Sequence, residues 1–419
     1  MPTAAIIGGG PSGLMAAEML LNQGLSVDLY EAKPSVGRKF LMAGKSGLNL
    51  THAESFDDFL KRFEKDQLKL APFIRHLPPA AIRKWVEDLG IETFEGTSQR
   101  IFPKVMKASP LLRNWLRRLE ELGLKIHLKH KWIGLSKDLQ LHFSTPEKNF
   151  ISNHDIKIFA LGGASWPKLG SDANWVNIFQ QQNIPITPFR PSNCGFNVNW
   201  SNIFLSKYSG APVKSCGVSV NGCDKIGDFI ITDYGLEGGV IYSHSRKILN
   251  EIREKRCAII SIDFIPQKNY DEIFSLVSKE KGKNTLTNHL RKNLNLSGVR
   301  ASLLREFTSP EKLKSAAALT KSIKALEIPI YQSQSIDRAI SSAGGICFDA
   351  IDSNLMIKKM PGFFVTGEML DWDAPTGGYL LTACFALGRG AATGAVKWLE
   401  AVSYTHLRAH ETREDLVCR

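Results

Sequence analysis

The chain has 419 residues, 43% hydrophobic and 22% charged, which is the composition of a globular protein longer than one hydrophobic core usually supports. Its net charge is +12, but the basic residues are spread along the chain with one enrichment at residues 279–292, which favours a solvated helical face over a nucleic-acid site. Seven cysteines without a CxxC pair or a His/Cys cluster exclude a disulfide framework and predict no metal site.

The first residues predict a strand, a glycine turn, a helix and a second strand. Residues 4–7 have the pattern of a buried strand, residues 14–23 that of a helix, and residues 27–30 that of the next strand. Glu31 follows this second strand, where an acid can accept hydrogen bonds from an adenosine ribose and would repel the 2′-phosphate of NADP. The order of these elements favours a dinucleotide site over a purely structural glycine turn.

Each glycine of the turn has a predicted purpose. Gly8 allows the tight turn, Gly10 lets the backbone approach a pyrophosphate, and Gly13 lets the helix pack closely on the strand. Pro11 and Ser12 begin the helix, whose free N–H groups and positive dipole end would hold the pyrophosphate.

The next region departs from simple strand-helix alternation and predicts a β-meander that returns to a parallel sheet. Residue patterns predict helices at 56–64, 80–89 and 110–122, and extended pieces at 100–103, 125–128, 131–135 and 139–144. A buried strand at 155–161 then leads into Gly162 and Gly163.

A different composition begins near residue 190 and predicts an inserted domain. Short alternating strands at 193–200, 215–221 and 228–232 indicate a small β-barrel or sandwich, and residues 268–327 are mostly helical and rich in lysine. The predicted fold is α/β, a discontinuous dinucleotide-binding Rossmann-like domain with a β-barrel-like plus helical insert. The expected bounds are residues 1–190 and 331–401 for the first domain, and 191–330 for the insert, β-rich at 191–266 and helical at 267–330.

The ends of the chain carry two further expectations. The start lacks the basic region of a signal peptide, and the apolar stretch 378–396 contains Arg389 and glycines, so we expect a cytoplasmic protein without a membrane span. Residues 402–419 resemble translated adapter DNA, so we expect them to be a non-native tail.

A second glycine-rich turn closes the chain. Residues 362–366 predict a buried strand that ends at Gly367 and Glu368, where an acid can bind the hydroxyls of a ribityl chain. Residues 375–380 then open the last helix, whose first N–H groups would face the pyrimidine edge of an isoalloxazine. A tight turn with a helix cap is the alternative. The two glycine-rich turns, one at each end of the chain, favour FAD over NAD as the cofactor.

These motifs together resemble the YhiN/BaiN-like bacterial FAD-dependent oxidoreductases over residues 3–400. The resemblance implies FAD, with NAD(P)H as the hydride donor, and one relative in the family reduces a conjugated C=C of bile-acid enones. The motifs that carry it are Gly37-Arg38-Lys39, residues 43–51, residues 160–167, residues 342–345, and Gly367-Glu368 with Gly377-Gly378-Tyr379. The cofactor-binding residues that it implies are Arg38, Lys39, Asn49, Gly162, Gly163, Gly367, Glu368, Gly377, Gly378, Tyr379 and Leu380.

Two positions depart from the family pattern. Leu48 stands where many members have cysteine, which rules out thiol chemistry in this loop and predicts a packing residue. Trp175 replaces a small residue, so we expect it to change the substrate preference. We also expect the insert to cap the flavin, with the glycine-rich end of strand 227–232 nearest to the ring.

Three functions compete at this point. The first is a flavin reductase of a small apolar conjugated substrate, with Arg100, Tyr234 and Tyr379 as candidates to bind a carbonyl or supply a proton, and no assigned catalytic residue. The second is an FAD-containing protein that binds or modifies nucleic acid, which residues 279–292 do not favour because they contain no aromatic residue. The third, an NAD-only dehydrogenase, leaves the closing turn unexplained. Since the chain has no second GxGxxG, the nicotinamide would bind only transiently.

Overall fold

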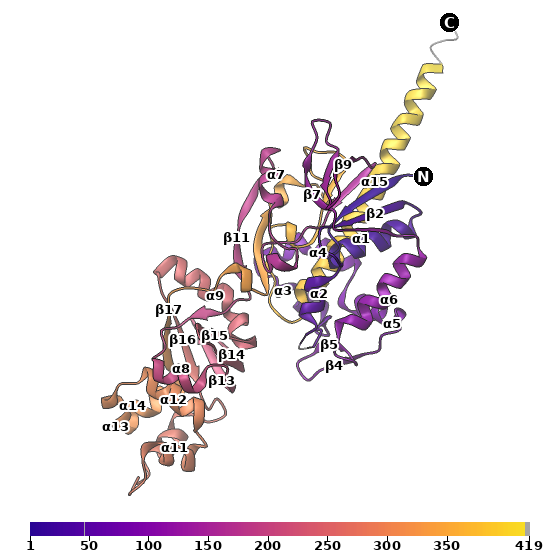
Figure 1. The fold of residues 1–419 in the computed structure, drawn as a ribbon. Helices are drawn as coiled ribbons and strands as arrows, with labels where there is room; N and C mark the ends of the chain where they lie inside the picture. Colours follow the sequence, from indigo (N-terminus) through magenta and orange to yellow (C-terminus); the bar gives the residue numbers. More distant parts are fainter. Residues whose placement is uncertain (46, 415–419) are drawn as a thin grey trace. The chain divides into compact units, whose positions relative to one another are not determined.

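The computed structural model describes residues 1–45 and 47–414, which form two compact units. The first unit contains Met1–Arg190 and the residues from Ser342 onward, and the second contains Pro191–Ser341. Each unit has its own hydrophobic core of buried residues. Figure 1 shows the helices and strands of both units.

A parallel sheet of five strands is the centre of the first unit. Its strand order is β19-β10-β1-β2-β6, with Ile6 of β1 opposite Leu29 of β2 and Ile158 of β10. These three side chains are fully buried, as expected for a parallel sheet covered on both faces. The strands are β1 (Thr3–Ile7), β2 (Ser26–Glu31), β6 (Lys125–Leu128), β10 (Ile156–Phe159) and β19 (Phe363–Val365).

Two small antiparallel sheets accompany the parallel sheet. One has the order β7-β8-β9 and links β6 to β10, so the predicted meander is confirmed. Their strands are β3 (Thr51–His52), β4 (Thr93–Glu95) and β5 (Arg100–Pro103) in one sheet, and β7 (Lys131–Leu135), β8 (Leu141–Ser144) and β9 (Asn149–Ser152) in the other.

The helices of the first unit include the first and last helices of the chain, which pack against each other. Pro11 begins the first helix directly after Gly10, a position where the missing N–H of proline costs no hydrogen bond. The helices are α1 (Pro11–Asn22), α2 (Arg38–Ala43), α3 (Phe56–Lys61), α4 (Gln67–His76), α5 (Pro79–Asp88), α6 (Ala108–Glu121), α7 (Trp175–Gln181) and α15 (Tyr379–Glu414), with 3-10 turns at Glu64–Asp66, Pro167–Leu169, Phe348–Ala350 and Gly367–Met369.

Helix α15 bears on two expectations about the end of the chain. It continues through residues 402–414 of the expected tail, and residues 415–419 lie outside the described part. Within that part, no helix combines the length and the apolar character that a membrane crossing needs.

The second unit is built on a six-stranded sheet in the order β12-β15-β14-β13-β16-β17. A bridge between Phe196 and Ser333 joins the first edge strand to the chain just after the last one, so the two edges meet and the sheet is barrel-like. The strands are β12 (Phe196–Asn197), β13 (Pro212–Val220), β14 (Cys223–Ile231), β15 (Gly235–Glu237), β16 (Ala258–Asp263) and β17 (Leu326–Ile330).

Helices follow these strands in the second unit. In one of them Asn269 and Glu272 form a reciprocal capping box, which satisfies two N–H groups at the helix start. The helices are α8 (Asn202–Tyr208), α9 (Gly239–Lys255), α10 (Tyr270–Val277), α11 (Leu286–Leu294), α12 (Gly298–Phe307), α13 (Pro310–Lys314) and α14 (Ala316–Lys324), with a 3-10 turn at Ile336–Arg338.

The chain passes between the units along β11 (Ile186–Ser192) and β18 (Ser341–Ile346), which pair with each other. The return to the first unit at Ser342 comes later than the expected residue 331. The reason is that Gln332 and Gln334 still form backbone hydrogen bonds with the segment around β12.

Candidate cofactor site

The glycines of the opening turn have two different environments. An added Cβ would lie 2.4 Å from the carbonyl oxygen of Ala160 at Gly8, and 2.0 Å from that of Gly8 at Gly13. At Gly10 it would meet nothing within 4 Å. Gly8 and Gly13 therefore pack against the protein, whereas Gly10 faces open space at the start of α1, where a pyrophosphate would fit.

Glu31 is held in place by the backbone. Its Oε2 accepts a hydrogen bond of 2.9 Å from the N–H of Gly9, and its Oε1 accepts one of 2.8 Å from the N–H of Lys33. Burial raises the pKa of Glu31, and these two bonds offset only part of the rise. The carboxyl group is thus pre-oriented beside the opening turn, where a ribose would lie.

The opening turn and the closing segment meet at Ser12. The Ser12 hydroxyl donates a hydrogen bond of 2.8 Å to the carbonyl oxygen of Cys384 in α15, and a Cβ at Gly367 would lie 2.4 Å from the same hydroxyl oxygen. Segments more than three hundred residues apart are thus in direct contact. The side chain of Ser12 serves this packing, which leaves its N–H group for a ligand.

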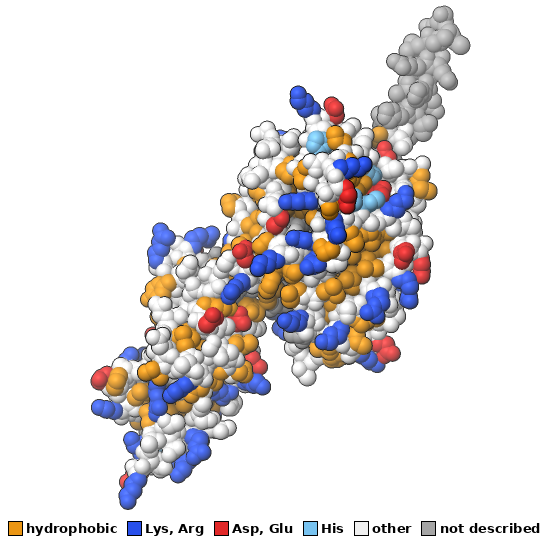
Figure 2. All heavy atoms as spheres, in the orientation of Figure 1, with side chains coloured by type: hydrophobic (Ala, Val, Ile, Leu, Met, Phe, Trp, Pro, Cys, Tyr) orange, Lys and Arg blue, Asp and Glu red, His pale blue; other side chains and the backbone are white. Residues whose placement is uncertain are grey.

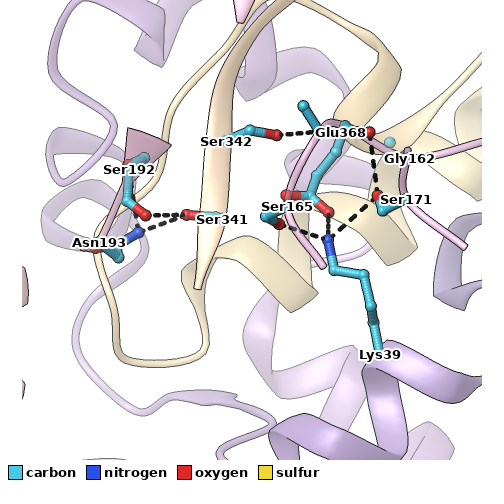
Figure 3. A network of polar contacts seen from close by, with 12 residues as sticks. Lys39, Gly162, Ser165, Ser171, Ser192, Asn193, Ser341, Ser342 and Glu368 are labelled. Carbon is cyan, nitrogen blue, oxygen red and sulfur yellow. Dashed lines mark hydrogen bonds and ion pairs between the residues drawn. The ribbon is translucent and has the colours of Figure 1, made fainter. Parts of the chain in front are cut away.

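Lys39 and Glu368 form the centre of a polar network (Figure 3). The ammonium of Lys39 lies 2.9 Å from Oε2 of Glu368, and it donates to the hydroxyls of Ser165 at 3.0 Å and Ser171 at 3.4 Å. All three donors of the ammonium are therefore used within the protein. The network fixes one oxygen of Glu368 and leaves the other, Oε1, buried without a protein partner.

The second glycine pair, Gly162 and Gly163, packs tightly. A Cβ at Gly162 would lie 2.5 Å from the hydroxyl of Ser171, and one at Gly163 would lie 1.9 Å from that of Ser342. Trp175 supports this turn by donating a hydrogen bond of 3.0 Å to the carbonyl oxygen of Gly162. Trp175 is only 3% exposed, so it is a core residue, and any effect on substrate preference would act through the turn that it supports.

Three predicted cofactor residues carry buried polar atoms without a partner. They are Nε of Arg38, Oδ1 of Asn49 and Oε1 of Glu368. Buried polar atoms are satisfied in most folded proteins, so these three could bind a polar ligand, although six other side chains among the described residues also carry such atoms. Leu48, by contrast, is 1% exposed, which confirms it as a packing residue. Ser46 of the same loop lies outside the described residues.

The closing turn packs against β3. A Cβ at Gly378 would lie 2.6 to 2.9 Å from three backbone atoms of Thr51, and one at Gly377 would lie 2.8 Å from the ring of Tyr379. Leu380 is half-buried beside them. These glycines are needed for packing, and the start of α15 follows directly.

Tyr379 is engaged within the protein. Its hydroxyl donates a hydrogen bond to Glu54, which also pairs with Arg62 at 2.8 Å, and its ring stacks on His52 at 5.5 Å. Burial and the Glu54 carboxylate raise the pKa of Tyr379. Arg100 lies opposite His52 in the sheet, so the structure brings Arg100 and Tyr379 to the same region. Tyr234, the third candidate, lies in the other unit with its hydroxyl bonded to Glu237.

Cys384 is a residue of this site that the sequence does not point to. It is buried in α15 beside Gly367, and burial raises the pKa of its thiol to about 12. The thiol is therefore protonated at neutral pH and a poor nucleophile. In the part of the chain that the structure describes, no group of His, Cys, Asp and Glu side chains could hold a metal ion.

The family model for the HI0933-like protein Rossmann domain matches residues 2–394. The chain belongs to this family. Membership confirms the resemblance found in the motifs and, together with the Rossmann-type flavoprotein fold, identifies the chain as an FAD-dependent oxidoreductase.

Two curated relatives cover nearly the whole chain. A 3-dehydro-bile acid delta(4,6)-reductase of Clostridium scindens is 23% identical over 95% of this chain and 100% of its own length. A ribosomal RNA dihydrouridine synthase of Haemophilus influenzae is 23% identical over 89% of this chain and 93% of its own length.

Solved structures share the fold. A flavocytochrome c3 fumarate reductase in its open conformation matches with a TM-score of 0.54 at 14% identity, over 95% of this chain and 78% of that one. A 3-ketosteroid-delta4-(5alpha)-dehydrogenase from Rhodococcus jostii RHA1 matches with a TM-score of 0.52 at 13% identity, over 94% of this chain and 96% of that one. At these identities the likeness establishes the fold alone.

Proposed function

We propose that the chain reduces a C=C bond conjugated to a carbonyl group in a small, largely apolar substrate, with NAD(P)H as the electron donor. The observation that carries this proposal is the match to the bile acid delta(4,6)-reductase over that protein's whole length. The arrangement of the predicted flavin contacts in one unit supports it.

The residues of the chain would hold FAD along one continuous path. Glu31 would bind the ribose, the free N–H groups at Gly10 and the start of α1 the pyrophosphate, and Oε1 of Glu368 the ribityl chain. Lys39 positions Glu368 for this contact. Bound FAD supplies the hydride transfer, and the protein supplies orientation and charge.

A substrate carbonyl needs a hydrogen-bond donor. Arg100 can polarise a carbonyl because its guanidinium always carries donors, but it does not release a proton at neutral pH. Tyr379 is held by Glu54, and its raised pKa opposes proton release to solvent. We assign Arg100 to carbonyl binding and Tyr379 to holding the closing turn.

The test is anaerobic reduction of the FAD-loaded protein followed by a screen of acceptors. NADH or NADPH should bleach the flavin, and an enone such as a 4-ene-3-ketosteroid should restore its colour. The matched control is the saturated ketone, which should not. If dithionite bleaches the flavin but neither nucleotide does, the donor assignment fails, and if oxygen alone restores the colour in every case, the reductase assignment fails.

A second candidate function is reduction of a base in RNA, which involves the same class of double bond. Two curated relatives are named ribosomal RNA dihydrouridine synthase. Lys and Arg side chains gather at the end of the second unit that carries α11 to α14 (Figure 2). The neighbouring helix α10 presents a stacked pair, Tyr270 and Phe274, which are 42% and 38% exposed.

Proteins that bind single-stranded nucleic acid commonly combine basic side chains with exposed aromatic rings on one surface. The pair of rings supplies the aromatic component that residues 279–292 lack. RNA binding that weakens with salt, and that the double substitution Tyr270→Ala with Phe274→Ala reduces, would favour this second function. Equal binding by both proteins would remove it.

A further inference from the structure

An open surface pocket of about 460 Å³ lies beside α2 and the start of α6, with a largely apolar lining that includes three basic residues. This volume is within the range of small-molecule sites. Neither Lys39 nor Glu368 lines it, but Arg38, a predicted flavin contact, does, so the cavity adjoins the predicted cofactor site. The lining residues are Ser35, Arg38, Leu41, Met42, Gly44, Lys45, Lys107, Ala108, Ser109 and Leu169.

The walls of this pocket are fixed by close packing. A Cβ at Gly44 would lie 2.5 Å from Cβ of Ala108, and one at Gly37 would lie 2.6 Å from the side chain of Leu112. The two ends of α2 are therefore in direct contact with α6. The backbone beneath the pocket is thus held by packing between the two helices.

The polar part of the lining fits phosphate groups. Three of the ten lining residues are cations, Arg38, Lys45 and Lys107, and none is acidic. Ser35 and Ser109 add hydroxyl groups. The N-cap of α6 is Lys107, whose side chain cannot accept a hydrogen bond, so no side chain caps the first N–H groups of this 14-residue helix.

The apolar part of the lining fits a nucleobase. Leu41 and Met42 are 37% and 38% exposed, and Leu169 lies among the same lining residues. Exposed apolar side chains beside three cations suit a ligand with a flat, weakly polar ring and several negative charges. That combination is the chemistry of a phosphorylated nucleoside.

We propose that this pocket binds the adenosine 2′,5′-bisphosphate portion of NADPH, and thereby selects NADPH over NADH as the electron donor. The inference rests on the proposed function, because it names the docking site of its donor. The chain has a single GxGxxG turn, so a second dinucleotide needs a site of another kind, and this pocket would supply it. The Glu31 carboxylate at the first turn would repel a 2′-phosphate, whereas this pocket would attract it.

The test measures binding of adenosine 2′,5′-bisphosphate to the FAD-loaded protein by calorimetry, and the KM values for NADPH and NADH. The double variant Lys45→Met with Lys107→Met removes two charges from the pocket and leaves Arg38, a predicted flavin contact, intact. Lys168→Met is the matched control, because Lys168 is exposed beside Leu169 but does not line the cavity.

The double variant should bind the bisphosphate only about tenfold more weakly, because the two ammonium groups that it lacks are exposed to solvent in the wild type. Its KM for NADPH should rise in proportion, its KM for NADH should change little, and its FAD content should equal that of wild type. Lys168→Met should behave as wild type. Bisphosphate binding that is unchanged in the double variant would overturn the proposal.

Other outcomes identify a different occupant. Loss of FAD from the double variant would assign the pocket to the adenosine of FAD, and weaker RNA binding with unchanged bisphosphate binding would assign it to a nucleic acid. Either result overturns the proposal. If the dithionite-reduced protein still reduces an enone while no nucleotide binds, only the donor site is wrong. If the bisphosphate binds as expected but no enone is reduced, the proposed substrate class is wrong and the pocket stands.

Discussion

The opening and closing turns are both rich in glycine, but Gly10 of the first and the glycine pair of the second have different surroundings. At the opening turn, Gly10 faces open space, so its missing side chain matters only to a ligand. At the closing turn, Gly377 and Gly378 face Tyr379 and the backbone of Thr51, so their missing side chains matter to the fold. A glycine-rich turn is therefore not in itself evidence of a ligand contact. The space in front of each glycine shows whether its missing side chain serves a ligand or the packing of the protein.

The sharpest test of this comparison is a pair of alanine substitutions. Gly378→Ala places a Cβ against three backbone atoms at a φ of +92°, so it should destabilise the FAD-free protein by about 2 kcal/mol or more. Gly10→Ala should cost at most ~1 kcal/mol, the effect of a poorer helix cap. Thermal unfolding of both variants measures this difference, and equal losses of stability would contradict it.

For FAD affinity the order should be reversed. A change beside the opening turn, at Glu31, should have the larger effect. Glu31→Ala removes a charged acceptor beside the opening turn, where such hydrogen bonds are worth about 1.5–3 kcal/mol, so FAD should dissociate roughly ten to a hundred times more readily. Titration of FAD-free protein with FAD measures the affinity. Glu87→Ala, an acid on the exposed face of α5, is the control. Unchanged affinity in Glu31→Ala would place the ribose elsewhere.

Glu31 beside the opening turn and Glu54 beside the closing turn should contribute to folding stability with opposite dependence on pH. Burial raises the pKa of Glu31, so the folded state takes up its proton more readily than the unfolded chain, and this protonation favours folding as the pH falls. Burial would also raise the pKa of Glu54, but hydrogen bonds from Arg62 and Tyr379 outweigh it and the pKa is lowered. The stability from Glu54 is thus present above the ordinary value of 4.5 and is lost as the pH falls below it.

Melting temperatures of the FAD-free variants from pH 7 to pH 4 measure these two trends. Glu54→Gln should melt below wild type at pH 7, and the difference should shrink as the pH falls through 4.5. Glu31→Gln should melt at or above wild type at pH 7, with that gain lost on acidification. Parallel curves for the two variants would mean that the acids do not differ in this way.

The smallest effect is expected at Cys384. Because burial raises the pKa of its thiol to about 12, iodoacetamide should not modify it in the folded protein at pH 8, while the half-buried Cys223 reacts. Cys384→Ala should leave flavin reduction unchanged, since the bond from Ser12 goes to the backbone carbonyl of this residue. Inactivation by a thiol reagent at Cys384 would contradict this expectation.

The sequence predicts local features well and long-range pairing poorly. The strand, turn and helix from β1 to α1 follow from short patterns, and so do the meander and the barrel-like sheet. Helix α4 is not predicted, because Pro72 in its interior is a signal against a helix. The pairing of Lys39 with Glu368, 329 residues apart, has no local signal at all.

The orientation of Trp175 also could not be predicted from the sequence. Its position in a family motif indicates proximity to the cofactor turn, which is correct, but the direction in which a side chain points depends on the packing around it. Phe179 and Phe189 surround the Trp175 ring with edge-on contacts and hold it in the core. The position of Trp175 in the motif thus predicts where the segment lies. It does not predict whether the side chain lines a pocket or supports one.

The pairing of β11 with β18 has an evolutionary consequence. The chain leaves and re-enters the first unit on two neighbouring strands, and these approach so closely that a Cβ at Gly344 would lie 2.6 Å from the carbonyl oxygen of Pro188. A gene segment that encodes residues 191–341 could therefore be exchanged, shortened or replaced by a hairpin without rerouting the parallel sheet. Such a cassette lets one flavin-binding framework be combined with different partner modules.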